Sequence, residues 1–187
     1  MKPVAIVGAS PVAIRAPYED TNIEIWEFNN RALTSPRIDT LFQMHDPSGY
    51  ELFGKEYLDY LSALTVPVYM REIRPEFPTS VAYPFSEILS MTGHIKQGRD
   101  GLKDLVFLTS SPAEAIALAI YQNRPCIDVY GIEFVDFKEY IEQAECILFW
   151  LGFAGGRGIP LNIYCANHIF QHPIYGEKVD GDGTQKQ

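Results

Sequence analysis

The chain opens with four consecutive apolar residues, Val4–Val7, which run directly into Gly8. The run has no alternation of apolar and polar residues, so it predicts a strand that is buried on both faces. Strands of this kind occur in parallel sheets that helices cover on both sides. A glycine at the carboxyl end of the strand lets the backbone approach a ligand, and ligands of open α/β sheets bind at that edge.

Predicted strands and helices alternate along the rest of the chain. Strands are predicted at residues 23–28, 40–44, 66–70, 127–131 and 160–165, and helices at residues 55–64, 111–121 and 139–153. Residues 71–86 hold three prolines and are expected to form a loop, residues 81–91 allow a strand followed by a helix, and residues 92–104 are expected to be an exposed loop. The alternation predicts an α/β, Rossmann-like fold, a mostly parallel sheet with helices on both faces. We expect a single domain over residues 1–176 and a flexible tail at residues 177–187.

The clearest local signal is the start of the helix at residues 111–121. Ser111 is predicted to cap it, Pro112 suits its first position, and Glu114 completes a capping box. Ser110 and Ser111 at this helix end are also suited to hold a phosphate group. As caps alone they need no ligand, and both interpretations stay open.

Composition excludes some classes of partner. The 187 residues carry a formal net charge of −9, which argues against nucleic acid and against an anionic membrane surface as partners. A phosphate-bearing small molecule is compatible with this charge, because a helix amino end binds phosphate without net positive charge. No apolar run approaches the roughly 18 to 20 residues of a membrane helix. With no signal peptide predicted, we expect a cytoplasmic protein.

Polar residues follow the predicted strands at the point where each strand ends. Because the carboxyl ends of parallel strands share one edge of the sheet, these residues are expected to converge there. The candidate catalytic residues are Glu133, His45 and Glu72. The candidate ligand-binding residues are Gly8, Ser10, Asn29, Asn30, Arg71, Ser110, Ser111 and Gly131, with Tyr140 and Gln143 on the following helix closing the pocket.

Each of these residues also has a purely structural interpretation. Ser10 can belong to a turn, and Asn29 with Asn30 can satisfy backbone groups of a loop. His45 beside Asp46 suits a general base or a metal corner, or a structural histidine in a polar loop. Arg71 suits an anion clamp or a surface ion pair. The dinucleotide glycine motif, the P-loop lysine, the nucleophile elbow and cysteine pairs at zinc spacing are all absent from the sequence, and no metal ligand is assigned.

Several of these motifs together resemble known families. They are Gly-x-x-Pro after the first strand, Asn29 after the second, the Thr109-Ser110 helix start, and the strand end Tyr-Gly-Ile-Glu-Phe at residues 130–134. The sequence resembles the bacterial CMP-sialic-acid-dependent sialyltransferases and the 6-hydroxymethylpterin pyrophosphokinase-like family of Rossmann-like proteins over residues 4–30 and 104–165. It also resembles small proteins of tailed bacteriophages, which would place it in the cytoplasm of the host cell. The resemblance implies a nucleotide near Gly8, Ser10, Asn29 and Ser110, with residues 131–133 lining the same cleft.

The chain departs from both families at specific positions. The sialyltransferases carry a long lid with a catalytic histidine after a Gly-Ile-Asp segment. Here Glu133 replaces the aspartate, and no histidine lies between Phe134 and the next predicted helix. The pyrophosphokinase group holds Mg²⁺ with carboxylates, for which Asp46, Glu72 and Glu133 are the candidates. The cofactor is therefore unknown, with Mg²⁺ as the candidate.

Three hypotheses for function follow from these observations. The first is a nucleotide- or sugar-nucleotide-binding transferase, glycosyl or pyrophosphoryl, with its ligand at the carboxyl edge of the sheet. The second is a non-catalytic protein that binds or sequesters a small molecule, as an accessory protein of a phage would. The third is a homo-oligomeric interaction protein whose frequent aromatic residues, 13% of the chain, form the interface.

Overall fold

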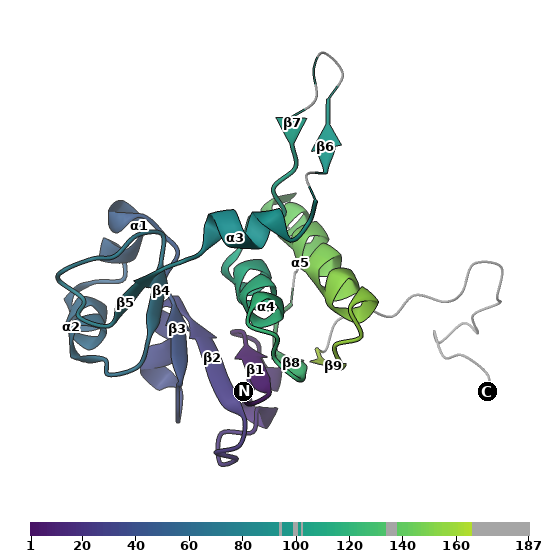
Figure 1. Cartoon of the computed structure of the whole chain (residues 1–187). Coiled ribbons are helices and arrows are strands. Elements are labelled where there is room, and N and C mark those ends of the chain that lie inside the picture. Colours follow the sequence, from purple (N-terminus) through teal and green to yellow (C-terminus); the bar gives the residue numbers. More distant parts are fainter. Residues whose placement is uncertain (94, 99–100, 102, 134–137, 166–187) are drawn as a thin grey trace.

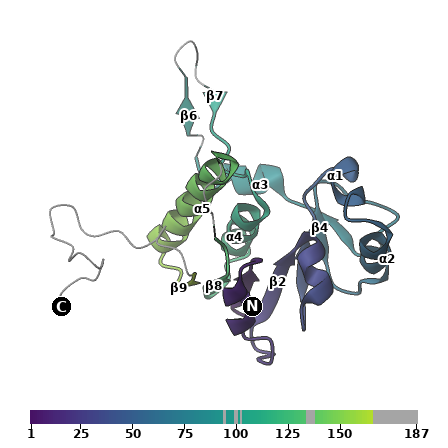
Figure 2. The same cartoon turned by 180° about the vertical axis from the view of Figure 1, so that it is seen from behind.

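The protein is built around one sheet, which Figures 1 and 2 show from opposite sides. The computed structural model describes residues 1–93, 95–98, 101, 103–133 and 138–165. The elements in chain order are β1 (Val4–Val7), η1 (Pro11–Arg15), β2 (Glu24–Phe28), η2 (Asn29–Thr34), β3 (Thr40–Phe42), α1 (Pro47–Glu51), α2 (Lys55–Ala63), β4 (Val68–Met70), β5 (Ser80–Ala82), α3 (Phe85–Ser90), β6 (Lys96–Gln97), β7 (Lys103–Asp104), α4 (Ser111–Tyr121), β8 (Ile127–Tyr130), α5 (Lys138–Gly156) and β9 (Leu161–Tyr164).

The main sheet has seven strands in the order β5-β4-β3-β2-β1-β8-β9, and every neighbouring pair is parallel. This confirms the predicted Rossmann-like α/β fold. The chain moves outward from β1 to β5, then returns through α4 to place β8 on the other side of β1. Strand order therefore reverses between β1 and β8, and in open α/β sheets ligands bind outside the carboxyl ends of strands at such a point.

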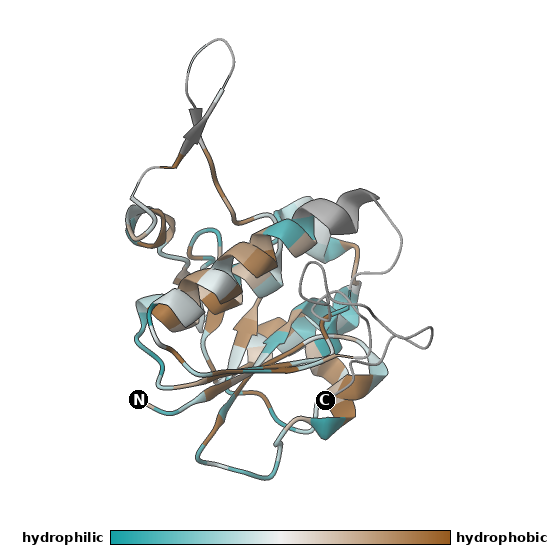
Figure 3. Ribbon diagram, turned by 90° about the vertical axis from the view of Figure 1, so that its right-hand side faces the viewer, coloured by the Kyte–Doolittle hydropathy of each residue, from teal (hydrophilic) through white to brown (hydrophobic). Residues whose placement is uncertain are grey.

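Strand β1 is buried on both faces, as its unbroken apolar run predicts. All four of its residues are 0% exposed. Val4 and Ile6 pack in the cluster that includes α4 and α5, whereas Ala5 and Val7 pack with Ala13 of η1 on the opposite face. A separate cluster joins α2 to β3 and β4. Figure 3 shows the mostly brown and pale strands lying between helices on either side of the sheet.

Residues 81–91 form the strand and helix that the sequence allows, and these elements take up the end of the loop expected over residues 71–86. Ser80–Ala82 forms β5 and pairs with β4 at the edge of the sheet, and α3 begins at Phe85. The prolines of this segment lie outside β5, so none removes a hydrogen bond of the ladder. Within residues 92–104, β6 and β7 form a short antiparallel hairpin that stands away from the sheet in Figure 1.

The carboxyl end of the chain lies outside the described residues. The described structure stops at Cys165, so both the last part of the expected domain and the expected tail at residues 177–187 fall beyond it. No helix in the described part of the chain is both long enough and apolar enough to span a membrane.

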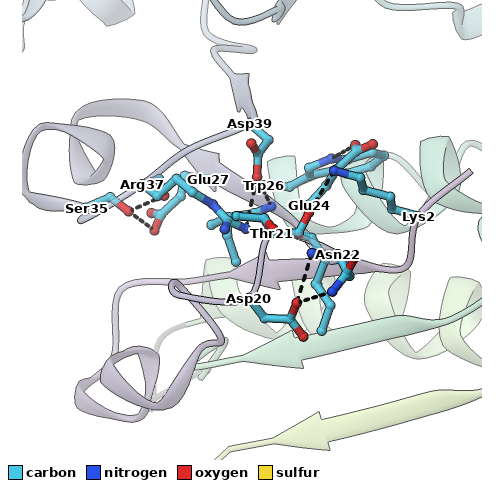
Figure 4. A network of polar contacts seen from close by, with 12 residues as sticks. Lys2, Asp20, Thr21, Asn22, Glu24, Trp26, Glu27, Ser35, Arg37 and Asp39 are labelled. Atoms are coloured by element: carbon cyan, nitrogen blue, oxygen red, sulfur yellow. Dashed lines mark hydrogen bonds and ion pairs between the residues drawn. The ribbon is translucent and has the colours of Figure 1, made fainter.

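An ion pair joins the end of α4 to the start of β2. The Arg124 guanidinium donates to both carboxylate oxygens of Glu24 at 2.7 Å and lies over the Trp26 ring at 5.1 Å. Figure 4 shows the indole of Trp26 donating to Glu24 as well, at 3.1 Å. Partial burial opposes ionisation of Glu24, but the hydrogen bonds from Arg124 and Trp26 outweigh it, so the pKa of Glu24 lies below its ordinary value.

We expect Arg124→Met to lower the free energy of unfolding by about 2 kcal/mol at pH 7, the usual range for hydrogen bonds to a charged group. A carboxylate whose pKa is lower in the folded state than in the unfolded state stabilises the fold at pH values above its unfolded-state pKa. This stabilisation is lost as the pH falls through its folded-state pKa. The deficit of the variant should therefore shrink in acid. Urea denaturation at pH 7 and pH 3.5 measures it, with Arg157→Met, which removes an exposed arginine, as control. An equal deficit at both pH values would contradict the role of the pair.

Candidate functional site

A cleft of about 620 Å³ lies where the carboxyl ends of β1, β2, β3 and β8 meet the amino end of α4. It therefore sits at the reversal of strand order between β1 and β8. Most of the residues that the sequence assigns to a site line this one cleft. They are Gly8, Ser10, Asn29, Asn30, His45, Arg71, Ser110, Ser111, Gly131, Glu133 and Gln143.

Two of the predicted site residues, Glu72 and Tyr140, are not among the residues that line the main cleft. Glu72 lines a neighbouring cavity of about 290 Å³ and forms an ion pair with Arg74 at 2.5 Å. Tyr140 belongs to α5, but its side chain lies outside those that the structure describes. Ile132, which the family resemblance placed in the cleft, lines it as well. The cleft also has lining residues that the sequence did not single out as site residues, namely Ala9, Phe28, Arg31, Met44, Leu108, Thr109, Pro112 and Glu114.

The floor of the cleft is formed where β1 and β8 end side by side. Gly8 N donates to Tyr130 O at 2.7 Å, and Ser10 N donates to Gly131 O at 3.1 Å. A Cβ on Gly8 would lie only 2.4 Å from Gly131 O, and Gly131 itself has a φ of +62°. The structural reason for a glycine at position 8 is therefore the close approach of the Gly131 backbone, which is a different reason from the approach of a ligand expected from the sequence.

Ser10, for which the sequence left a turn and ligand binding as alternatives, makes two hydrogen bonds within the protein. Its hydroxyl accepts from Val12 N at 3.3 Å and so caps η1. The same hydroxyl donates to Glu133 Oε1 at 2.8 Å across the end of the sheet. This hydrogen bond joins the segments after β1 and β8, so the turn at Ser10 also orients a carboxylate that lines the cleft.

Asn29 lies at the end of β2 in a conformation that few residues adopt. Its φ is +49°, in the left-handed region that asparagine tolerates better than most side chains. Its Oδ1 atom is buried and has no hydrogen-bond partner among the described residues. A buried acceptor without a partner costs about 1–3 kcal/mol. A ligand N–H or O–H is the kind of donor that would satisfy it.

The N-cap of α4 lies one residue earlier than the sequence predicts. Ser110, with extended backbone, is the N-cap, and its hydroxyl accepts from Ala113 N at 3.4 Å. Ser111 is therefore the first residue of the helix, and the predicted cap at Ser111 with a capping box to Glu114 is wrong. The helix has eleven residues, and its positive dipole end faces the cleft. Pro112 has no N–H, and Ser110 accepts from the N–H groups of Ala113 and Glu114, so Ser111 supplies the one N–H of the first four helical residues that the cap does not take up.

Because the capping box does not form, the Glu114 side chain is free to turn into the protein. The residue is 7% exposed and lines the cleft, and its carboxyl has no hydrogen bond among the described residues. Burial raises the pKa of Glu114 to about 8, and the nearby positive charge of Arg71 only partly opposes this. Sequence reasoning missed this residue because the spacing Ser-x-x-Glu indicated a cap.

A second buried carboxyl lies behind the cleft. Glu27 of β2 is fully buried, and it accepts from Ser35 Oγ at 2.7 Å and from Tyr18 Oη at 3.0 Å. Figure 4 shows the contact with Ser35. Burial raises the pKa of Glu27. Arg31, which lines the cleft, approaches this carboxyl to 4.0 Å and donates to Tyr18 Oη at 3.4 Å, so this group of residues holds Arg31 in place.

The carboxylates considered for Mg²⁺ do not come together. Asp46 accepts from Gly49 N at 3.0 Å and caps α1, and it lines the neighbouring cavity together with Glu72. Glu133 lines the main cleft instead. Among the described residues there is no group of three or more His, Cys, Asp or Glu side chains placed to hold a metal ion. The residues present therefore do not form a ready magnesium site.

The fold is similar to that of a bacterial sialyltransferase. CstII from Campylobacter jejuni, solved with the substrate analogue CMP-3FNeuAc, matches 89% of this chain over 82% of its own, with a TM-score of 0.56 and 13% sequence identity. CstII in complex with a trisaccharide acceptor and CMP matches with a TM-score of 0.54 and 12% identity over the same shares of the two chains. No protein-family model and no curated protein sequence matches this chain.

Proposed function

We propose that this protein binds a nucleotide or a sugar nucleotide in the cleft and acts as a transferase. The observation that carries the proposal is the position of the cleft, at the reversal of strand order and against the amino end of α4. Its volume of about 620 Å³ lies within the usual range for a small-molecule site. The similarity of the fold to CstII, which was solved with CMP and with a CMP-sugar analogue, supports the choice of ligand class.

Each wall of the cleft suits one part of such a ligand. The positive dipole end of α4, with the Ser111 N–H and the Ser110 segment, suits a phosphate group, because a helix amino end attracts anions. Arg31 and Arg71 add positive charge to the same cleft. Asn29, with its unpaired buried oxygen, suits a hydroxyl or amino group of the nucleoside.

The cleft also holds groups suited to proton transfer. Transfer to an acceptor hydroxyl needs a base near the reacting oxygen, and His45 and Glu133 both line the cleft. The hydrogen bond from Ser10 holds Glu133 in position. Glu72 is not part of this proposal, because it lines the neighbouring cavity and pairs with Arg74.

Binding without catalysis is a second candidate, favoured by one observation. The residues between Glu133 and α5 are Phe-Val-Asp-Phe, so the sequence carries no histidine where the sialyltransferase resemblance implies a catalytic one. A protein that only binds its ligand would take it up at one equivalent per chain without turnover. Incubation with CMP-sugars and lactose, followed by chromatography of the products, separates the two candidates.

The binding site is tested with the double variant Asn29→Ala, Ser110→Ala. Loss of one or two hydrogen bonds to the ligand should weaken the affinity about 10- to 100-fold. Calorimetric titration with CMP and with CMP-sugars measures this change, with and without Mg²⁺. A ligand that binds only the native state also raises the melting temperature, which gives an independent readout.

The matched control is the double variant Ser90→Ala, Asn123→Ala. Asn123 has a φ of +54°, close to that of Asn29, and both control residues are exposed and lie outside the cleft lining. The control therefore repeats the backbone strain of the Asn29 substitution without touching the site. Equal nucleotide affinity in the site variant and the control would contradict the proposal.

A further inference from the structure

The Glu114 carboxyl lines the cleft, and the proposed binding of a nucleotide does not yet give it a role. It is 7% exposed, the rest of the residue is enclosed by the core around α4, and no described side chain or backbone group hydrogen-bonds to the carboxyl. The carboxyl oxygens are not among the fully buried unpaired atoms of the described residues, so they reach the surface of the cleft, while burial of the rest of the residue disfavours the ionised form. The cleft is the side from which a partner can reach it.

We propose that Glu114 is a further ligand-binding residue, a carboxylic acid that keeps its proton and donates a hydrogen bond to an anionic phosphate group held at the amino end of α4. The inference rests on the proposed function, because it concerns the same cleft. It adds the ionic state of the ligand: the group beside Glu114 is an anion with a free acceptor oxygen.

Electrostatics favours the protonated form in this position. An ionised Glu114 would place a negative charge in the first turn of the helix whose amino end would hold the phosphate, and the two anions would repel. A protonated carboxyl removes the repulsion and supplies an O–H donor to the phosphate. Burial raises the pKa of Glu114 to about 8, so the neutral acid predominates at pH 7.

The surrounding charges are consistent with this assignment. Arg71 is the charged group close enough to lower the pKa of Glu114, and it does not overcome the effect of burial. Tyr83 packs against α4, and its hydroxyl donates to the backbone oxygen of Glu114 at 2.7 Å. This hydroxyl therefore does not hydrogen-bond to the Glu114 carboxyl. The other charged or titratable side chains that line the cleft are Arg31, His45 and Glu133.

The consequence is that ligand binding takes up a proton in alkaline solution. Above about pH 8 the free protein has lost the Glu114 proton, whereas the bound anion restores it. The affinity should fall about tenfold per pH unit over that range. Calorimetry at pH 8.5 in two buffers of different ionisation enthalpy should show uptake of about half a proton or more per ligand bound.

The test measures the affinity of CMP, UMP, AMP and GMP between pH 6.5 and 9.5 for the wild type, Glu114→Gln and Glu145→Gln. Glu145 is an exposed glutamate of α5, so Glu145→Gln should keep the wild-type pH dependence. Glu114→Gln should lose it, because the amide cannot ionise. The secondary ionisation of the nucleotide phosphate affects all three proteins alike.

The outcomes separate the two proposals. Binding with parallel pH profiles in the wild type and Glu114→Gln would overturn the role of Glu114 and leave the nucleotide site standing. Absence of binding by all four nucleotides at every pH would overturn both. If Glu114→Gln does not fold, the two-buffer calorimetry of the wild type decides alone, and uptake near zero at pH 8.5 overturns the inference.

Discussion

Gly8→Ala is expected to lower the free energy of unfolding by about 3–5 kcal/mol, the upper range for a single substitution. The added Cβ would lie 2.4 Å from Gly131 O and 2.9 Å from Gly131 C, and both are backbone atoms. Backbone cannot rotate away as a side chain can, so β1 and β8 would have to separate. Because the floor of the cleft is built from these two strand ends, the variant should also lose nucleotide affinity.

Thermal unfolding followed by circular dichroism measures the effect, and a fall of roughly 10 °C or more is expected for a chain of this size. Gly152→Ala in the middle of α5 is the matched control, because nothing lies within 4 Å of its Cβ position. That control should be neutral or stabilising by about 0.5–1 kcal/mol, since alanine favours a helix over glycine. A melting temperature of Gly8→Ala within 3 °C of the wild type would refute the steric account.

Glu114→Gln is expected to stabilise the free protein in alkaline solution by a few kcal/mol, as an order of magnitude from the pKa shift. Burial raises the pKa of Glu114 from 4.5 to about 8. Between these values the folded state keeps the proton and the unfolded state has released it. The stability of the wild type therefore falls as pH rises from about 4.5 to about 8, and glutamine does not share this loss.

The way in which the stability difference between the two proteins changes with pH makes this prediction specific. The two proteins should have nearly equal stability at pH 4, a growing difference through neutral pH, and a constant difference above about pH 8. Urea denaturation of the ligand-free proteins across this range measures it. Glu145→Gln, at an exposed position of α5, should follow the wild type throughout. A difference that is independent of pH would show that Glu114 has no raised pKa in the folded state.

The sequence predicted the core of the fold because its strongest signals are local. An unbroken apolar run such as Val4–Val7 has to be buried on both faces, and the structure buries it so. The alternation of strands and helices then favours parallel pairing, which all seven strands show. The errors occurred at short elements. Strands β6 and β7 have two residues each and lie where an exposed loop was expected, because such segments have too few residues to produce a periodic pattern.

The candidate site was predictable in part for the same reason. Residues that follow parallel strands share an edge, so Ser10, Asn29 and Glu133 were expected to meet and do line one cleft. The sequence could not separate Glu72 from Arg71, because both follow β4 directly. Arg71 lines the main cleft, whereas Glu72 lines only the neighbouring cavity. Glu114 was assigned to a cap from its spacing, and a shift of the N-cap by one residue to Ser110 removed that role.

The sequence by itself determined where most of the strands and helices form and which polar side chains follow these strands, because hydrophobic pattern and turn chemistry act over a few neighbouring residues. Only the tertiary structure decided that β8 lies beside β1, that the Gly131 backbone fills the space left at Gly8, and that Glu114 is buried. These features depend on contacts between residues more than a hundred positions apart or on burial by several elements at once. No local sequence pattern predicts such contacts. These contacts determine the shape of the cleft and the protonation state of Glu114.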